Sequence, residues 1–183
     1  MKIKPARKKG KVVVELGSRD QSILTAAPAG AAFRLKQILV PVDFSECSRK
    51  ALRYAVPLAN EFRARITLLH VIETAYVMGE FGAVDYLAMA ADLATEAERQ
   101  LRDLAGVEIG SSAAWKTAVR PGRPATEIAG AARELKADLI VIATHGRTGL
   151  KHALLGSVAE NVVRHAPCPV LTVRENEREF VES

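Results

Sequence analysis

The chain alternates short, mainly apolar segments with segments of helical character, and this alternation constrains its fold more than any other feature. The apolar segments span residues 38–42, 66–72, 113–119, 139–142 and 170–173. Strands that are apolar at every position, rather than at every second one, are typical of a parallel sheet with both faces covered. Since crossovers between parallel strands are right-handed, we predict an α/β fold with a doubly wound, five-stranded parallel sheet.

Helices are expected between these strands. Apolar spacing or helix-favouring composition predicts them over residues 51–62, 86–104, 124–135 and 158–165, and Ser45 is the candidate N-cap of the first. Residues 78–94 contain glycines and aromatic side chains. This stretch reads either as an irregular lead into the second helix or as a flexible lid over a ligand.

The two ends of the chain differ from the region between them. Residues 1–35 begin with a basic run, include a possible short strand at 12–16 and read as a flexible extension. Residues 36–174 carry the alternating pattern, and residues 175–183 form an acidic tail. The net charge of +5 belongs mainly to the basic run. Because no aromatic residues are interleaved with it, we do not expect nucleic acid as a partner.

Several classes of protein are not supported. No apolar run approaches the roughly 18 residues that span a membrane, and no secretory signal is recognisable. Cys47 and Cys168 read as reduced thiols in a cytoplasmic protein. The four histidines have no metal-ligand spacing, and no nucleophile motif has supporting context, so we assign neither metal ligands nor catalytic residues.

The turn after the strand at 139–142 is the most informative stretch. In doubly wound folds the ligand binds beyond the carboxyl ends of the strands, where the strand order reverses. This turn contains Gly146 and Gly156, and Ser157 with Glu160 matches a capping box that starts a helix at Ser157. A helix N-terminus favours phosphate, and Arg147 adds positive charge. The turn is neither a Walker A loop nor a dinucleotide fingerprint, and an ordinary connection fits its local features equally well.

Three segments resemble the universal stress protein family. They are QILVPVDFS at 37–45, LLHVI at 68–72 and ADLIVIATHGRTGLKHALLGSVAENVVRHAPCPVLTV at 137–173. Members that bind ATP carry the pattern G-x2-G-x9-G followed by Ser or Thr, and Gly146, Gly156 and Ser157 match it. Ala143 replaces the first glycine. The resemblance covers about residues 36–174 and implies a Rossmann-like sheet of the adenine nucleotide alpha hydrolase type.

The resemblance also implies a binding site for ATP. Gly146, Gly156, Ser157 and Val158 would contact phosphates mainly through backbone N–H groups. The nucleoside end would be formed by Pro41, Val42, Asp43, Val71, Ile142 and Ala143. Since a carboxylate repels a triphosphate, Asp43 would face the nucleoside, and the alternative is that Asp43 caps the following helix.

The function implied is a regulatory ATP-binding module in a stress response. Mg²⁺ would be held mainly by the phosphates and water. Two alternatives stay open: a slow ATPase or autophosphorylating enzyme, with Ser157 or Thr148 as acceptor, and an interaction protein without a nucleotide. The resemblance further implies a homodimer through the last strand, residues 170–173.

Overall fold

The computed structural model describes residues 2–5, 12–15, 34–145 and 155–175. The chain divides into two compact units, residues 1–33 and 34–183. In the first unit, β1 (Lys2–Pro5) pairs antiparallel with β2 (Val12–Glu15). The strand at 12–15 was predicted, whereas its partner was not, because lysine and proline are depleted in strands.

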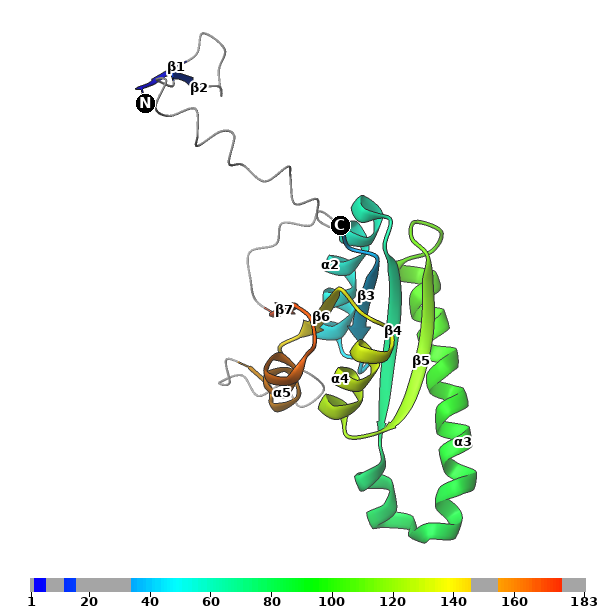
Figure 1. Cartoon of the computed structure of the whole chain (residues 1–183). Coiled ribbons are helices and arrows are strands. Elements are labelled where there is room, and N and C mark those ends of the chain that lie inside the picture. The colour runs from blue at the N-terminus through cyan, green and yellow to red at the C-terminus, as the bar shows by residue number, and fades with distance from the viewer. Residues whose placement is uncertain (1, 6–11, 16–33, 146–154, 176–183) are drawn as a thin grey trace. The chain divides into compact units, whose positions relative to one another are not determined.

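The second unit is built on a five-stranded parallel sheet in the order β5-β4-β3-β6-β7 (Figure 1). Its strands are β3 (Gln37–Pro41), β4 (Arg65–Glu73), β5 (Trp115–Gly122), β6 (Leu139–Ala143) and β7 (Val170–Val173). The chain proceeds outward from β3 to β5, and then returns to place β6 and β7 on the other side of β3. This confirms the predicted doubly wound, Rossmann-like fold, with its reversal of strand order between β3 and β6.

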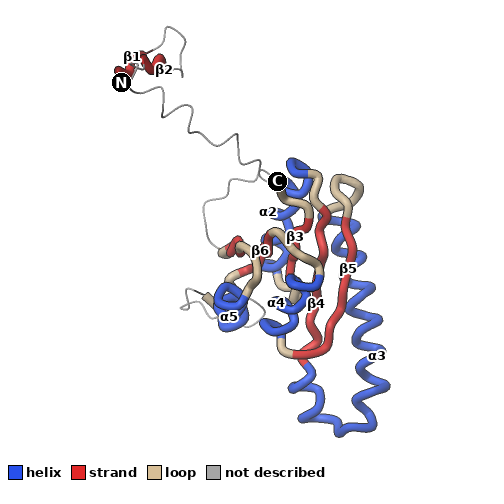
Figure 2. Tube along the Cα trace, in the orientation of Figure 1, coloured by secondary structure: helices blue, strands red, loops and turns tan. Residues whose placement is uncertain are grey.

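Helices cover both faces of the sheet (Figure 2). They are α2 (Glu46–Phe62), α3 (Thr74–Glu108), α4 (Pro124–Glu134) and α5 (Ser157–His165). On one face, Leu52 of α2 and Leu101 of α3 pack with Ile38 and Val40 of β3. On the other face, the cluster around α4 and α5 includes Leu39 of the same strand. Alternate residues of β3 thus enter opposite cores, which explains why the strand is apolar throughout.

Two elements are longer than predicted. The backbone of α3 is helical from Thr74 to Glu108, so the irregular lead expected within residues 78–94 is wrong. Each of its early glycines disfavours helix by only about 1 kcal/mol, which a long helix tolerates. β5 runs on to Gly122 through Pro121 rather than ending at residue 119. Because β5 is an edge strand, a proline can be accommodated within it.

Among the residues that the structure describes, no helix is long and apolar enough to cross a bilayer.

The core beneath α3 provides a test of the fold. Leu101 is fully buried, whereas Val107 of the same helix is 83% exposed. Leu101→Ala should lower the free energy of unfolding by about 2–5 kcal/mol, because it leaves a cavity between α3 and the sheet. Val107→Ala should change it by less than about 0.5 kcal/mol. Urea denaturation measures both, and equal effects would contradict this packing of α3.

Candidate functional site

The carboxyl ends of β3 and β6 meet where the strand order reverses, the position at which doubly wound proteins bind ligands. The connection after β6 and the start of α5 also lie at this end of the sheet. We call this region the switch-point crevice and define it by residues 42–45, 70–71, 142–145 and 156–158. Gly146 and Arg147, both predicted to bind phosphate, lie outside the described residues.

The end of β3 is held by a local hydrogen-bond network. The Val42 N–H donates to the Leu69 carbonyl at 2.8 Å, which extends the pairing of β3 with β4 beyond Pro41. Asp43 Oδ1 accepts hydrogen bonds from the backbone N–H and the hydroxyl of Ser45, at 3.0 and 2.5 Å. Ser45 Oγ in turn accepts from the Ser48 N–H at 3.2 Å and caps α2, as predicted. Asp43 therefore orients the capping residue, and its contact with a nucleoside stays a prediction.

Phe44 and His70 form a part of the crevice that sequence reasoning did not single out. Phe44 has φ 66°, a left-handed conformation that is unusual for a bulky residue. Its ring lies 4.7 Å from that of His70, and His70 Nδ1 is 2.8 Å from the Val42 carbonyl oxygen. Since a carbonyl only accepts, Nδ1 carries the proton in this bond. Such strain is often found at functional sites, but no local sequence signal would have revealed it.

The backbone of Val71 faces the crevice. Backbone groups of successive strand residues point to alternate sides, and the Leu69 carbonyl points toward β3. The N–H and carbonyl of Val71 therefore point to the same side, past the end of β3 at Pro41. This orientation suits the predicted backbone contact with adenine, although it does not test that contact.

Ala143 fits its position without strain. It is the last residue of β6, opposite Val173, and its methyl packs against the core on the α2 side. Ala143 is not among the described residues with positive φ, so this position does not require glycine. The preceding Ile142 is only 5% exposed and packs into the other core, with α4 and α5. The Ile142 side chain therefore belongs to the core beneath the crevice rather than to its surface.

Thr144 joins three segments at the base of the crevice. Its N–H donates to the Val173 carbonyl at 2.8 Å, and its own carbonyl accepts from the Gly156 N–H at 2.7 Å. The side chain is 1% exposed, and its hydroxyl lies 2.9 Å from Nδ1 of His145. These bonds, which we call the Thr144 clasp, hold together the end of β7, the end of β6 and the start of α5.

Gly156 is required by this clasp rather than by an unusual φ. Its φ of −70° and ψ of 154° are open to most residues. However, a Cβ built on Gly156 would lie 2.8 Å from the Thr144 carbonyl oxygen, closer than real Cβ contacts occur. The glycine thus allows two backbone segments to approach each other.

The start of α5 differs from the predicted capping box. The helix begins at Ser157, as expected, but its N-cap is Gly156 and no side chain caps it. The Gly156 carbonyl accepts from the Glu160 N–H at 2.9 Å, which moves the cap one residue earlier. Glu160 pairs instead with Arg164 at 2.8 Å. In the part of the chain that the structure describes, no side chain caps the N–H groups of the first turn of α5, which lie at the positive end of the helix dipole.

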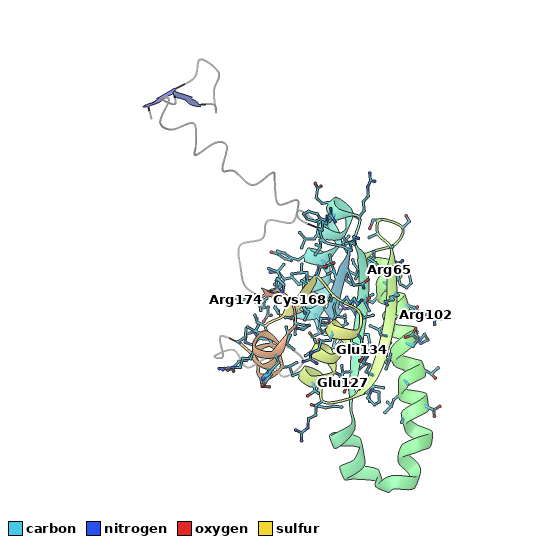
Figure 3. All side chains as sticks on the ribbon, viewed as in Figure 1. Arg65, Arg102, Glu127, Glu134, Cys168 and Arg174 are labelled. Carbon is cyan, nitrogen blue, oxygen red and sulfur yellow. The ribbon has the colours of Figure 1, made fainter. Side chains whose placement is uncertain are left out.

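Ionic contacts join β5 to α4 near the turn that connects them. Arg120 Nη1 donates to Glu134 Oε1 at 3.1 Å and lies 3.9 Å from Glu127 Oε2. Glu127 and Glu134 both belong to α4, as Figure 3 shows. The hydrogen bond from Arg120 lowers the pKa of the Glu134 carboxyl. Arg123, in the turn itself, is exposed.

Both cysteines are free thiols, as predicted. Burial raises the pKa of the Cys47 thiol, and the carboxylates of Glu175 and Asp43 raise it further. Burial likewise raises the pKa of the Cys168 thiol. Neither sulfur is therefore activated as a nucleophile at neutral pH.

The strand order and the helices on both faces define a doubly wound α/β protein. The chain matches the model of the universal stress protein family over residues 34–174, and it belongs to that family.

Individual relatives support this assignment. Universal stress protein MJ0531 of Methanocaldococcus jannaschii is 35% identical over 144 residues, which cover 79% of this chain and 85% of the relative. The solved structure of protein MJ0577 is 30% identical, with a TM-score of 0.68 over 80% of this chain and 100% of that chain. A universal stress protein solved in complex with cAMP is 24% identical, with a TM-score of 0.55 over 79% and 100% of the two chains. At that identity, the last comparison supports the fold alone.

The close approach at Gly156 can be tested against a glycine elsewhere. Gly156→Ala should lower the free energy of unfolding by about 1–3 kcal/mol, because the added methyl meets backbone that cannot move freely. No heavy atom lies within 4 Å of a Cβ built on Gly106, in α3. Gly106→Ala should raise the free energy of unfolding by up to about 1 kcal/mol, the gain in helix propensity. Urea midpoints measure both changes, and a neutral Gly156→Ala would show that the Thr144 clasp is looser than described.

Proposed function

We propose that this universal stress protein binds an adenine nucleotide, ATP with Mg²⁺, in the switch-point crevice and acts as a regulatory module. The observation that carries the proposal is the first turn of α5, which the Thr144 clasp holds at the carboxyl end of β6, the strand next to β3. N–H groups at a helix start, together with the helix dipole, suit a phosphate group. The resemblance of residues 143–158 to the ATP pattern of the family supports the same ligand.

The structure refines which groups would contact the phosphates. The Gly156 N–H already donates to Thr144, so the role of Gly156 is to close the connection. The phosphate donors are then the N–H groups of Ser157 and Val158, together with the exposed Ser157 hydroxyl. Gly146 and Arg147 remain further phosphate contacts in this proposal. Mg²⁺ would neutralise the phosphates while being held mainly by them and by water.

The nucleoside would occupy the end of the crevice near β3 and β4. Pro41, Val42 and Asp43 border this end, and the backbone of Val71 faces it. In this proposal Asp43 faces the nucleoside, because its charge would be unfavourable beside the phosphates. The Phe44 and His70 rings add a partly buried aromatic wall beside the same end.

A regulatory role is proposed because the sequence supplies a phosphate cradle without an assigned catalytic residue. Phosphoryl transfer needs an oriented nucleophile and cationic stabilisation of the transition state. Repeated release of phosphate per site would favour the slow ATPase instead. If no nucleotide copurifies with the protein and added nucleotide does not bind, the alternative of an interaction protein without a nucleotide would be favoured.

Ser157 offers a direct test, because its side chain makes no capping bond. Ser157→Ala should weaken ATP–Mg²⁺ binding about 10- to 150-fold, the range expected for one hydrogen bond to a charged group, and leave stability nearly unchanged. Ser111→Ala, an exposed serine before the amino end of β5, should change neither. Isothermal titration calorimetry with ATP, ADP and AMP measures the affinities.

Native mass spectrometry of freshly purified protein complements the titration by identifying the bound nucleotide. The proposal fails if the wild-type protein neither retains nor binds an adenine nucleotide. If it binds one but Ser157→Ala has no effect, the phosphate position at α5 is wrong.

We further propose a homodimer through the edge strand β7. The Leu171 and Val173 backbone groups face β6, so those of Val170 and Thr172 point outward from the sheet. The side chains of residues 170–172 are only partly buried. An apolar strand with outward backbone groups is suited to pairing with a second copy.

Thr172→Pro tests this interface, because proline removes an outward N–H while the bonds to β6 remain. It should shift the protein from dimer to monomer in light scattering coupled to size exclusion, with ATP affinity retained. The control is Thr172→Val, which keeps the outward N–H and should remain dimeric. A wild-type protein that is monomeric at tens of micromolar would refute the interface.

A further inference from the structure

A second hollow lies at the opposite end of the sheet from the switch-point crevice. We call it the basic hollow; its lining includes Lys36, Phe62, Arg63, Arg65, Lys136 and Asp138. These residues stand where β3, β4 and β6 begin and where α2 and α4 end. Figure 3 labels Arg65 at this end of β4.

The positive charges of the basic hollow are not compensated. Lys36, Arg63, Arg65 and Lys136 are all exposed, and within the described part of the chain none of the four forms an ion pair. By contrast, five arginines elsewhere are paired with carboxylates: Arg53, Arg99, Arg102, Arg120 and Arg164. The nearby Asp138 uses Oδ2 to accept the backbone N–H groups of Lys36 and Gln37, at 2.8 and 3.0 Å. Four cations thus surround one carboxylate that is already engaged.

The backbone positions from which these side chains extend are fixed relative to one another. The Arg65 N–H donates to the Lys36 carbonyl, and the Asp138 N–H donates to the Gln37 carbonyl, each at 2.9 Å. The start of β3 is therefore tied on one side to β4 and on the other to β6.

Two of the cations sit at strained positions. Arg63 has φ 53° and Lys136 has φ 49°, in the turns that follow α2 and α4. Glycine or asparagine usually fills such left-handed positions, because other residues are disfavoured there. Attraction to the helix C-termini accounts for positive charge at these two positions. It does not account for Lys36 and Arg65, which precede and begin strands.

An aromatic side chain lies among the charges. Phe62, the last residue of α2, lines the basic hollow and is 37% exposed. An acidic peptide could bind to the four cations through its carboxylates, but it would give the exposed ring no role. An exposed ring among cations is the combination that binds single-stranded nucleic acid, in which phosphates meet the charges and a base stacks on the ring.

We propose that the basic hollow binds single-stranded nucleic acid, with Lys36, Arg63, Arg65 and Lys136 contacting phosphates and Phe62 stacking on a base. This site is separate from the proposed nucleotide crevice and does not depend on it. The sequence did not reveal it, since the basic run at the N-terminus lacks aromatic residues. The cations of the hollow come from three segments that are far apart in the sequence: Lys36, then Arg63 and Arg65, and then Lys136.

The test uses the full chain and a fluorescent single-stranded oligonucleotide, with affinity measured by anisotropy over a range of salt concentrations. Arg63→Asn with Lys136→Asn removes two charges while keeping residues that tolerate the left-handed conformation. The slope of log affinity against log salt should fall by about 1.4, and the affinity at 0.1 M salt by at least about tenfold. Phe62→Leu should lower affinity about tenfold with the slope unchanged, because stacking does not release counterions.

The matched control removes the same charge from the protein elsewhere. Arg49→Gln with Arg174→Gln alters two exposed cations outside the hollow and should leave the slope within about 0.3 of wild type. Each pair is also placed in a background with Lys8, Lys9 and Lys11 changed to Gln, which removes a contribution from the basic run. The proposal is overturned if the oligonucleotide does not bind at low salt, if both pairs act equally, if the effect vanishes in that background, or if polyglutamate competes as well as the oligonucleotide.

Discussion

The hydrogen bonds of Thr144 are the interaction on which the site depends. Through its N–H and carbonyl, one buried residue ties the edge strand β7 and the start of α5 to the end of the neighbouring strand β6. Thr144 and Gly156 are therefore held next to each other. The first turn of α5 is thereby fixed beside the end of β6, and its N–H groups become a preorganised feature of the crevice.

The sequence was a good guide where periodicity and burial decide the structure. Mainly apolar strands required two covered faces, and residues such as Ile38 and Leu39 enter opposite cores as that pattern implies. It was a poorer guide where backbone geometry decides. The left-handed Phe44 and the shift of the α5 cap to Gly156 depend on contacts between distant segments. Local patterns do not encode such contacts, so Ser157 was taken as the cap although it is the first helical residue.

The two ends of the sheet offer different chemistry. At the carboxyl ends, backbone N–H groups and half-buried rings form a crevice suited to a small ligand. At the amino ends, long cationic side chains surround an open hollow, which suits an extended anion. This division arises from the parallel arrangement itself, because all helix-to-strand turns gather at one end and all strand-to-helix turns at the other.

Gly156 shows how a motif can combine two separate requirements. A side chain there would collide with the Thr144 carbonyl whether or not a ligand is bound. A related chain that bound no nucleotide would therefore still keep the glycine, since its fold would demand it. The residue at position 156 therefore says little about whether a related chain binds a nucleotide. The residue at position 157 says more, because the fold does not require its hydroxyl.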